Sequence, residues 1–582
     1  MASMFVVQIN ASRVARWLMA GVCLLLPTIA AAQLRDGATQ QLQRQQERER
    51  VLREQQETQP GLRRDGEPAA PTGNLPVGES PCFRIDRIVL DGELSERFGW
   101  ALRAADPNGD PATGRCLGTA GVNLTLKRVQ NAILVRGYIT TRVLAAPQDL
   151  ASGTLALSVV PGRIRAVRFL DGTPSQASWR NALPTGPGEL LNLRDIEQGL
   201  ENLQRIPTVS ADLQIVPAEG TDARAGDSDL AISWQQRKRW RANLSLDDSG
   251  SEATGKLQAG ATLSIDNGLR ANDLFYANVG HSVFDGDGKG TASWTAHYDL
   301  PYGHWLAGIT AGSYDYRQTV AGPFQHFRYS GTSDNAELRV SRLLFRNAHA
   351  RIGAHARGWW RQSDNFVDDT EIEVQRRRTA GWELGLTHRQ FIGPATFEAS
   401  AAYRRGTGAF GALRAPEEIV HALDPSMPLE GTSRMRLAIA DAQLAVPFRL
   451  GRQALRYTAN WRAQWNDTPL SPQERFAIGG RYTVRGFDGE VSLTGERGWL
   501  LRNDLSLALG GDQAFYLGAD YGQVGGPATQ QQLGDHLAGA VIGLRGGWRG
   551  LSWDAWVGAP IDKPRGFPTA YTTFGFTLGA TF

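Results

Sequence analysis

The sequence predicts two kinds of structure in one chain: α+β domains over residues 81–238, then an all-β transmembrane barrel of about sixteen antiparallel strands over residues 239–582. Two observations carry this prediction. From Trp240 onward, apolar and polar residues alternate, as in a closed sheet with one face toward lipid and one toward a polar lumen. Before Trp240, two consecutive units of about 75–80 residues repeat one order of elements: strand, two helices, two strands.

The composition excludes some classes of protein. Hydrophobic residues make up 41% of the chain and its mean hydropathy is −0.32. A helical membrane bundle would need several apolar runs of about 20 residues, whereas a barrel does not, because only alternate residues of its strands face lipid. The 62 Lys and Arg residues nearly balance the 59 Asp and Glu residues, so the charge gives no indication of a nucleic-acid partner.

Residues 1–32 are predicted to be a secretory signal peptide. Arg13 and Arg16 precede an apolar segment at 17–29, and Ala30-Ala31-Ala32 provides a small-residue cleavage site. The alternative is a membrane anchor, which is disfavoured because the apolar run is too short to span a bilayer comfortably. Export would place the rest of the chain in an oxidising compartment.

Residues 33–58 are predicted to contain a helix, from Ala38 to Thr58, that is polar on all sides. Leu42, Val51 and Leu52 are almost its only apolar residues, so it has no apolar face with which to pack on a core. It is either held in a polar environment or is a frayed, solvated tail. Residues 59–80 are rich in Pro and Gly and are predicted to form a semi-extended linker.

The two α+β units are predicted from local patterns. In residues 81–162 we expect a strand at 83–90, helices near 95–105 and 124–136, and strands at 135–141 and 153–160. In residues 163–238 we expect a strand at 164–170, helices near 175–182 and 193–206, and strands at 212–216 and 230–234.

Short turns and long connections alternate along the predicted barrel. The long connections are residues 406–432, 467–497 and 525–535. Because bacterial barrels have short periplasmic turns and long outer loops, we expect 467–497 on the outer side, between about the eleventh and twelfth strands. A connection of this length tends to be functional.

The centre of that loop, Val484-Arg485-Gly486-Phe487, resembles the conserved tetrad of two-partner secretion outer-membrane transporters. These form the TpsB family, of the haemolysin-activator and filamentous-haemagglutinin transporter type, and are related to barrel-assembly proteins. A second motif, Gly518-Ala519-Asp520-Tyr521-Gly522, resembles the family's Gly/Phe-x-Asp-x-Gly strand. The C-terminal Phe582 resembles the insertion signal of outer-membrane proteins.

The resemblance implies a role for each region. The Arg-Gly-Tyr-x-Thr-Thr-Arg run at 136–142 and Pro161-Gly162-Arg163 resemble POTRA sequences. It therefore implies periplasmic POTRA domains at 81–162 and 163–238, and an N-terminal helix that plugs the barrel lumen. It also implies that loop 467–497 folds back into the barrel, where Arg485 meets an acidic wall residue, and Asp520 is the candidate.

The alternation of residues in the Asp520 strand supports a position for Asp520 on the inner wall of the barrel. The alternate residues Phe515, Leu517, Ala519 and Tyr521 form an apolar row suited to lipid, so Asp520 is expected to face the lumen. Gly518 and Gly522 flank it and leave room for an incoming loop, while Gly486 allows a tight turn behind Arg485. A hydrated, unpaired Asp520 is the alternative.

Cys82 and Cys116 are the two cysteines that remain after signal cleavage, and both lie in the first predicted domain. We expect a disulfide between them in an exported protein, with two free thiols as the alternative.

The sequence contains no His-Glu-x-x-His pair, no Gly-x-Ser-x-Gly elbow and no P-loop. We therefore expect no enzyme activity, no catalytic residue, no metal site and no cofactor. Histidines of the barrel, such as His297 and His388, are interpreted as wall residues.

The resemblance implies that the chain moves a specific partner exoprotein, adhesin-like or haemolysin-like, from the periplasm to the cell surface. The POTRA domains would receive this partner unfolded, and the barrel would contact outer-membrane lipid. The alternative is a factor that inserts other barrels, which two POTRA repeats and the polar helix disfavour. A passive porin would not explain the soluble domains.

Overall fold

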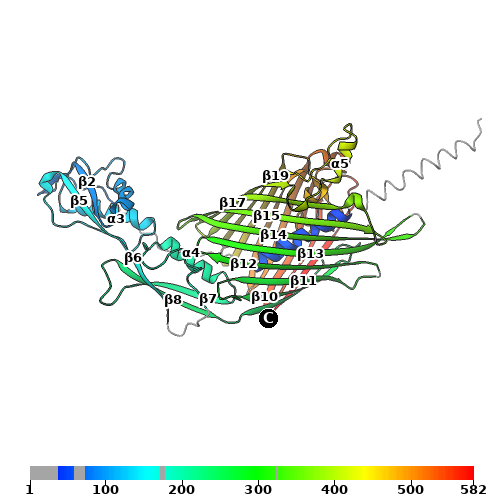
Figure 1. Cartoon of the computed structure of the whole chain (residues 1–582), viewed down its shortest axis with the longest axis horizontal. Helices are drawn as coiled ribbons and strands as arrows, with labels where there is room; N and C mark the ends of the chain where they lie inside the picture. Colours follow the sequence, from blue (N-terminus) through cyan, green and yellow to red (C-terminus); the bar gives the residue numbers. More distant parts are fainter. Residues whose placement is uncertain (1–36, 58–72, 171–176, 287, 323) are drawn as a thin grey trace, which may run out of the picture.

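The computed structural model describes residues 37–57, 73–170, 177–286, 288–322 and 324–582 (Figure 1). The predicted signal peptide at 1–32 and the predicted linker as far as residue 72 lie outside the described residues. The described chain forms an N-terminal helix of residues 37–56, two small α+β domains and a closed barrel. None of the helices in this described part is long and apolar enough to cross a membrane.

The barrel has sixteen long antiparallel strands, as predicted, and closes by pairing of its last strand with its first. A two-residue strand, β16 (Thr370–Glu371), adds to the end of one of them. The sixteen are β9 (Trp240–Asp247), β10 (Leu257–Asp266), β11 (Leu274–Val283), β12 (Gly290–Tyr302), β13 (Trp305–Ala321), β14 (His326–Arg346), β15 (Ala350–Val367), β17 (Arg377–Ile392), β18 (Ala395–Thr407), β19 (Arg436–Leu450), β20 (Gln453–Asn466), β23 (Arg497–Gly510), β24 (Gln513–Gly525), β25 (His536–Trp548), β26 (Leu551–Asp562) and β27 (Thr573–Thr581).

The outer wall of the barrel is apolar because alternate residues of neighbouring strands come into register. Five residues on five consecutive strands lie side by side and are 40–61% exposed: Leu505, Leu517, Ile542, Val557 and Phe574. Rows of this kind face the acyl chains of a membrane. The residues between them, such as the buried Ser506 and Tyr516, point into the lumen.

Short connections gather at the end of the barrel that adjoins the second α+β domain, and the long connections gather at the other end (Figure 1). One long connection, residues 408–435, contains the helix α5 (Pro416–Leu423). Another, residues 467–496, lies between the eleventh and twelfth long strands, as predicted. This asymmetry orients the barrel with its α+β domains on the periplasmic side.

The first α+β domain packs its helices on a three-stranded sheet of order β2–β5–β4. Its elements are β1 (Phe83–Arg84), β2 (Arg87–Gly92), α2 (Ser95–Phe98), η1 (Gly99–Ala104), β3 (Cys116–Leu117), α3 (Thr119–Val135), β4 (Arg142–Leu144), η2 (Leu150–Ser152) and β5 (Thr154–Val160). The strand expected at 135–141 is wrong. Helix α3 continues to Val135, and a turn with Gly137 in the left-handed region, at φ +96°, delays the strand to Arg142.

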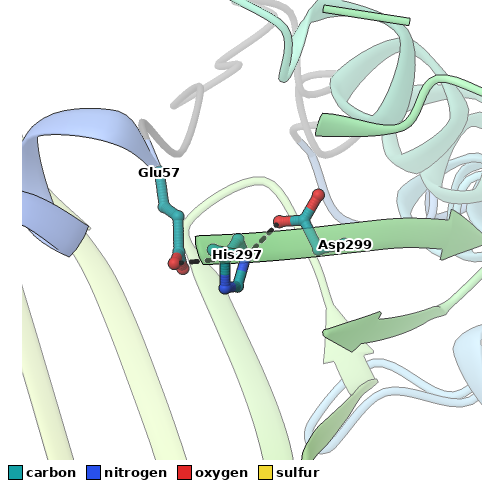
Figure 2. A group of neighbouring side chains, drawn as sticks. All are labelled: Glu57, His297 and Asp299. Carbon is teal, nitrogen blue, oxygen red and sulfur yellow. Dashed lines mark ion pairs between the residues drawn. The ribbon is translucent and has the colours of Figure 1, made fainter. Parts of the chain in front are cut away.

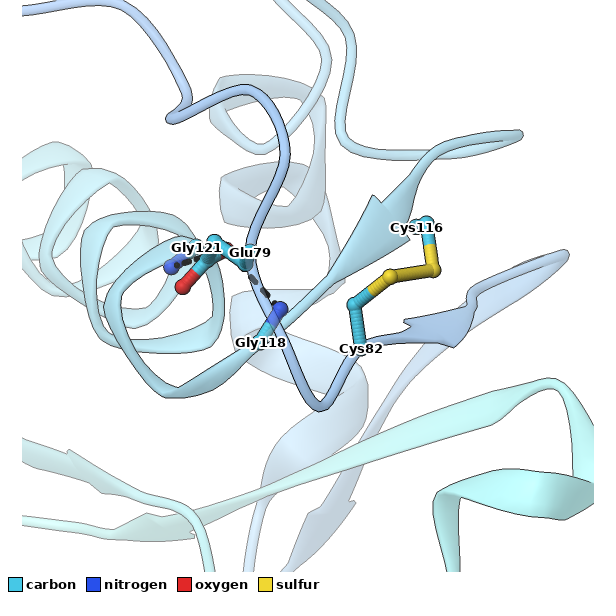
Figure 3. Close-up of a disulfide and its surroundings, with 5 residues drawn as sticks. All are labelled: Glu79, Cys82, Cys116, Gly118 and Gly121. Atoms are coloured by element: carbon cyan, nitrogen blue, oxygen red, sulfur yellow. Dashed lines mark hydrogen bonds between the residues drawn. A yellow bond between two sulfur atoms is a disulfide. The ribbon is translucent and has the colours of Figure 1, made fainter.

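The predicted disulfide is present, since Cys82 and Cys116 are bonded across the small β1–β3 pair (Figure 3). The predicted linker at 59–80 ends earlier than expected. Leu75 is buried in the core of the first domain, and the Glu79 carboxylate accepts hydrogen bonds from the backbone N–H groups of Gly118 and Gly121, where α3 begins (Figure 3). Residues 73–80 therefore belong to this domain, because they cap its main helix.

The second α+β domain has a sheet of order β6–β8–β7 and one long helix. Its elements are β6 (Arg163–Phe169), α4 (Leu193–Gln204), β7 (Val209–Pro217) and β8 (Asp227–Gln236). The helix expected near 175–182 is wrong for its described part: residues 177–182 are not helical, and 180–182 form a turn. Here tertiary contact overrides the local pattern, because Asn181 donates to Pro301 O and accepts from Gly303 N in a turn of the barrel.

Candidate functional site in the barrel lumen

The loop between β20 and β23 folds back into the barrel and packs there on an apolar core. Its short strands β21 (Phe476–Ile478) and β22 (Leu493–Gly495) pair with each other. Val484 and Phe487 of the tetrad are buried in this core. The core consists of Phe476, Ile478, Val484, Phe487, Leu493, Leu500, Val524, Leu537 and Phe567.

The guanidinium of Arg485 forms a bidentate ion pair with the carboxylate of Asp520 on the barrel wall. Nε donates to Oδ2 and Nη2 donates to Oδ1, each at 2.7 Å, and the Arg485 backbone N–H also donates to Oδ2 at 3.0 Å. The two side chains are only 5% and 1% exposed. A planar guanidinium suits this geometry, which a lysine cannot reproduce.

Glycines leave the space that this contact needs. A Cβ at Gly518 would lie 2.7 Å from Arg485 Nη2, and one at Gly522 would lie 2.9 Å from Val484 Cγ2. Gly486 has φ +94°, and a Cβ there would lie 2.5 Å from Ala559 O. At Gly486 the clash is with backbone, so a side chain there would push the loop from the wall, whereas a side chain at Gly518 or Gly522 would displace the side chain of Arg485 or Val484.

Two further residues near the pair escaped the sequence analysis. Asp504 accepts from Arg485 Nη2 at 2.7 Å, and Arg502 Nε lies 3.8 Å from Asp520 Oδ2. They pair in register with Gly518 and Asp520 on the neighbouring strand. Their alternation indicates that they share a face, but which face they share depends on register, which the sequence leaves open.

The N-terminal helix, residues 37–56, lies inside the barrel (Figure 1). It contacts the wall through Arg53, whose Nη2 donates to Glu337 at 2.5 Å, and through Glu47, which accepts from Arg462 at 2.7 Å. It contacts the inward loop through Gln43, which donates to Arg475 O at 3.2 Å. A helix that is polar on all sides thus occupies a polar lumen. Two cavities, of about 560 and 820 Å³, remain beside it.

The second α+β domain docks on the barrel through α4. Arg346 of β14 contacts Glu197 at 3.1 Å and Glu201 at 2.9 Å, and all three side chains are 4% exposed. Asn202 adds a hydrogen bond of 2.7 Å to Gly303 O. These contacts hold the domain against the short turns, next to the opening of the lumen.

A sixteen-stranded barrel that carries two α+β domains at its short-turn end, and that holds a helix and an inward loop in its lumen, defines a class of protein. It is a barrel transporter of the outer membrane with N-terminal POTRA domains.

Comparison with known proteins gives the family. Residues 226–546 match the family described as haemolysin secretion/activation protein ShlB/FhaC/HecB. Residues 83–162 match the ShlB-type POTRA domain and residues 163–217 match a POTRA domain. The chain belongs to the ShlB/FhaC/HecB family, and it is a two-partner secretion transporter of the outer membrane that translocates an exoprotein.

Individual relatives agree with this assignment. The chain is 37% identical over 577 residues to outer membrane transporter CdiB-2 of Burkholderia pseudomallei (strain 1026b), covering 96% of each. It is 25% identical over 454 residues to hemolysin transporter protein ShlB of Serratia marcescens, covering 78% of this chain and 75% of that one. The solved structure of CdiB from Acinetobacter baumannii is 31% identical, with a TM-score of 0.83 over 94% of this chain and 98% of that one.

Proposed function

We propose that this transporter passes its exoprotein through the lumen in unfolded form, after the N-terminal helix has left it and while the inward loop stays in place. The contrast between the two lumen occupants carries the proposal. The loop is fixed by a nine-residue apolar core and the bidentate pair of Arg485 with Asp520. The helix makes mainly polar contacts, and its buried apolar residues are Ala38 and Leu42 near its start.

The polar contacts of the helix suit a removable plug. The ion pairs from the helix to the wall, Arg53–Glu337 and Glu47–Arg462, keep 15–28% of their side chains exposed, so water reaches them and can solvate both partners when the helix leaves. An α-helix with its side chains is about 10–12 Å wide, so its departure would free a passage for an extended chain, which is narrower. The residues proposed as the transport motif, Val484, Arg485, Gly486 and Phe487 with Gly518, Asp520 and Gly522, would then form a fixed rim of that passage.

Export needs a direction, and folding of the exoprotein outside the cell supplies it. A folded domain is stable by about 5–15 kcal/mol, which makes its return as an unfolded chain rare. We propose that the chain itself catalyses no reaction. We also propose that its apolar outer rows contact outer-membrane lipid.

The similarity to CdiB transporters covers more of the chain, at higher identity, than the similarity to ShlB. We therefore propose that the exoprotein is of the kind exported by CdiB transporters rather than by haemolysin transporters.

The proposal is tested by expressing the chain with a candidate exoprotein of the kind exported by CdiB transporters, in a strain that lacks both. Surface exposure of that exoprotein, measured by protease accessibility on intact cells, should require the transporter. The amounts of other outer-membrane barrels should not change. A fall in other barrels, with no effect on the exoprotein, would favour the assembly-factor alternative.

A further inference from the structure

Three side chains of the types that bind metal ions meet where the N-terminal helix ends (Figure 2). Glu57 follows the last turn of the helix, and His297 and Asp299 are alternate residues of β12 that both point inward. His297 Nε2 lies 3.5 Å from Glu57 Oε1 and 3.4 Å from Asp299 Oδ2. The side chains of His297 and Asp299 are 7% and 3% exposed.

The position between these atoms can hold a cation. His297 Nδ1 is paired with Thr310 Oγ1 at 2.8 Å, so Nε2 is the nitrogen that faces the two carboxylates. Within the described residues, His297 Nε2 and Asp299 Oδ1 are buried and have no hydrogen-bond partner. In the tautomer whose Nδ1–H donates to Thr310 Oγ1, the neutral imidazole presents the Nε2 lone pair, which is the form that binds a metal ion.

The three side chains have the chemistry and the spacing of a zinc site. Zn²⁺ takes imidazole nitrogen and carboxylate oxygen at about 2.0–2.2 Å, so tetrahedral ligand atoms lie about 3.3–3.6 Å apart. The 3.5 Å between His297 Nε2 and Glu57 Oε1 falls in this range, and ligand atoms of all three residues lie within 4.8 Å of one another. The Thr310 contact would orient the ring, as the outer partners of zinc-bound histidines do.

We propose that Glu57, His297 and Asp299 bind Zn²⁺, and that the bound metal links the end of the N-terminal helix to the barrel wall. The free Oδ1 of Asp299 is the oxygen available to the metal, because Oδ2 accepts from Arg205 of the second POTRA domain. Arg205 and Arg53, whose Nε lies 3.8 Å from Glu57, add positive charge and weaken the site. A weakly bound metal can dissociate, which would release the end of the helix from the wall. Binding of the metal does not depend on the proposed plug role, whereas its effect on conductance does.

The first experiment measures binding of Zn²⁺ alone to the full-length protein, purified without a histidine tag and stripped with chelator. One Zn²⁺ per chain is expected by calorimetry, and Co²⁺ should give the visible absorption of a low-symmetry site. His297→Ala and Glu57→Gln should each weaken binding by at least about tenfold. His388→Ala, which removes a histidine lining the same cavity, should bind like the wild type.

Glu57→Gln is not expected to misfold, because Glu57 lies outside the barrel wall. The heat-dependent gel shift of each variant shows whether its barrel is folded. No stoichiometric binding by the wild type would overturn the proposal. Unchanged binding by either Glu57→Gln or His297→Ala would also overturn it, and would leave a proton as the cation between these groups.

The second experiment records conductance in planar bilayers. Zn²⁺ should lower the frequency of open events in the wild type, chelator should reverse this, and Glu57→Gln should not respond. Binding without any change in conductance would support the metal site and contradict the plug.

Discussion

Arg485 and Asp520 are 35 residues apart in the chain, yet share two hydrogen bonds of 2.7 Å in a site that is almost closed to water. Burial makes the pair costly to break from one side, because the remaining charge would have no partner. Removal of one member of such a pair costs about 3–5 kcal/mol.

Arg485→Ala and Asp520→Ala should therefore each impair secretion, and the double variant should lose less than the sum of the two. Arg485→Lys should not restore secretion, because an ammonium cannot reproduce the bidentate contact. Arg378→Ala, which removes a barrel arginine that donates to the amide oxygen of Gln362, is the matched control. Additive losses in this double-mutant cycle would show that the two residues support secretion for reasons other than their contact with each other.

Deletion of residues 33–58 should raise ion conductance in planar bilayers while the barrel stays folded. The reason is that the helix occupies the lumen through contacts such as Arg53–Glu337 and leaves cavities of about 560 and 820 Å³ beside it. A substitution that spares the helix, Arg549→Ala in a short turn, should leave conductance unchanged. Equal conductance of the deletion variant and the wild type would contradict a plug.

Reduction of Cys82–Cys116, or the double change Cys82→Ser and Cys116→Ser, should destabilise the first POTRA domain by about 2–4 kcal/mol, since the bridge closes a loop with a separation of 34 residues. Thermal unfolding followed by a signal from Trp100 checks this. In unreduced, denatured protein neither thiol should react with an alkylating reagent, and quantitative labelling of both would refute the bridge.

The first POTRA domain should lose stability in acid. Hydrogen bonding from Arg128, and then from the Leu75 backbone N–H, lowers the pKa of Asp110 below its ordinary value. A group whose pKa is lowered by folding stabilises the fold above its unfolded pKa, of about 3.9, and this stabilisation is lost as pH falls toward the folded pKa. Asp110→Asn should flatten the dependence of the melting temperature on pH below about pH 4. An identical dependence in both proteins would contradict this.

The exoprotein should add a strand to a POTRA sheet, because backbone pairing accepts varied unfolded sequences. β8 is the central strand of its sheet, which leaves β6 and β7 as edges, and β7 is the longer at nine residues. A photo-crosslinking residue at Gln214 of β7 should capture the exoprotein during export. The same residue at Gln235 of β8 is the control. Absence of crosslinks along the whole of β7 would exclude this edge.

The sequence by itself determined the architecture. Alternation from Trp240 onward specifies strands because the side-chain period of a strand is two, and the periodic signal is strong enough to count about sixteen of them. The tetrad at 484–487, the Asp520 strand and the two cysteines were also visible, because each is local in the sequence. Together they were sufficient to indicate the family.

Apart from the pairing of Arg485 with Asp520, which the family resemblance implied, only the tertiary structure decided which distant residues meet. Asp504 joins Arg485, and Glu57 joins His297, through strand register and the position of the N-terminal helix, neither of which has a local signal. Local patterns failed where tertiary contact or backbone conformation prevailed, as at Asn181 and Gly137. The physical reason is the same in each case: periodicity is a property of one segment, whereas a site depends on how separate segments are placed.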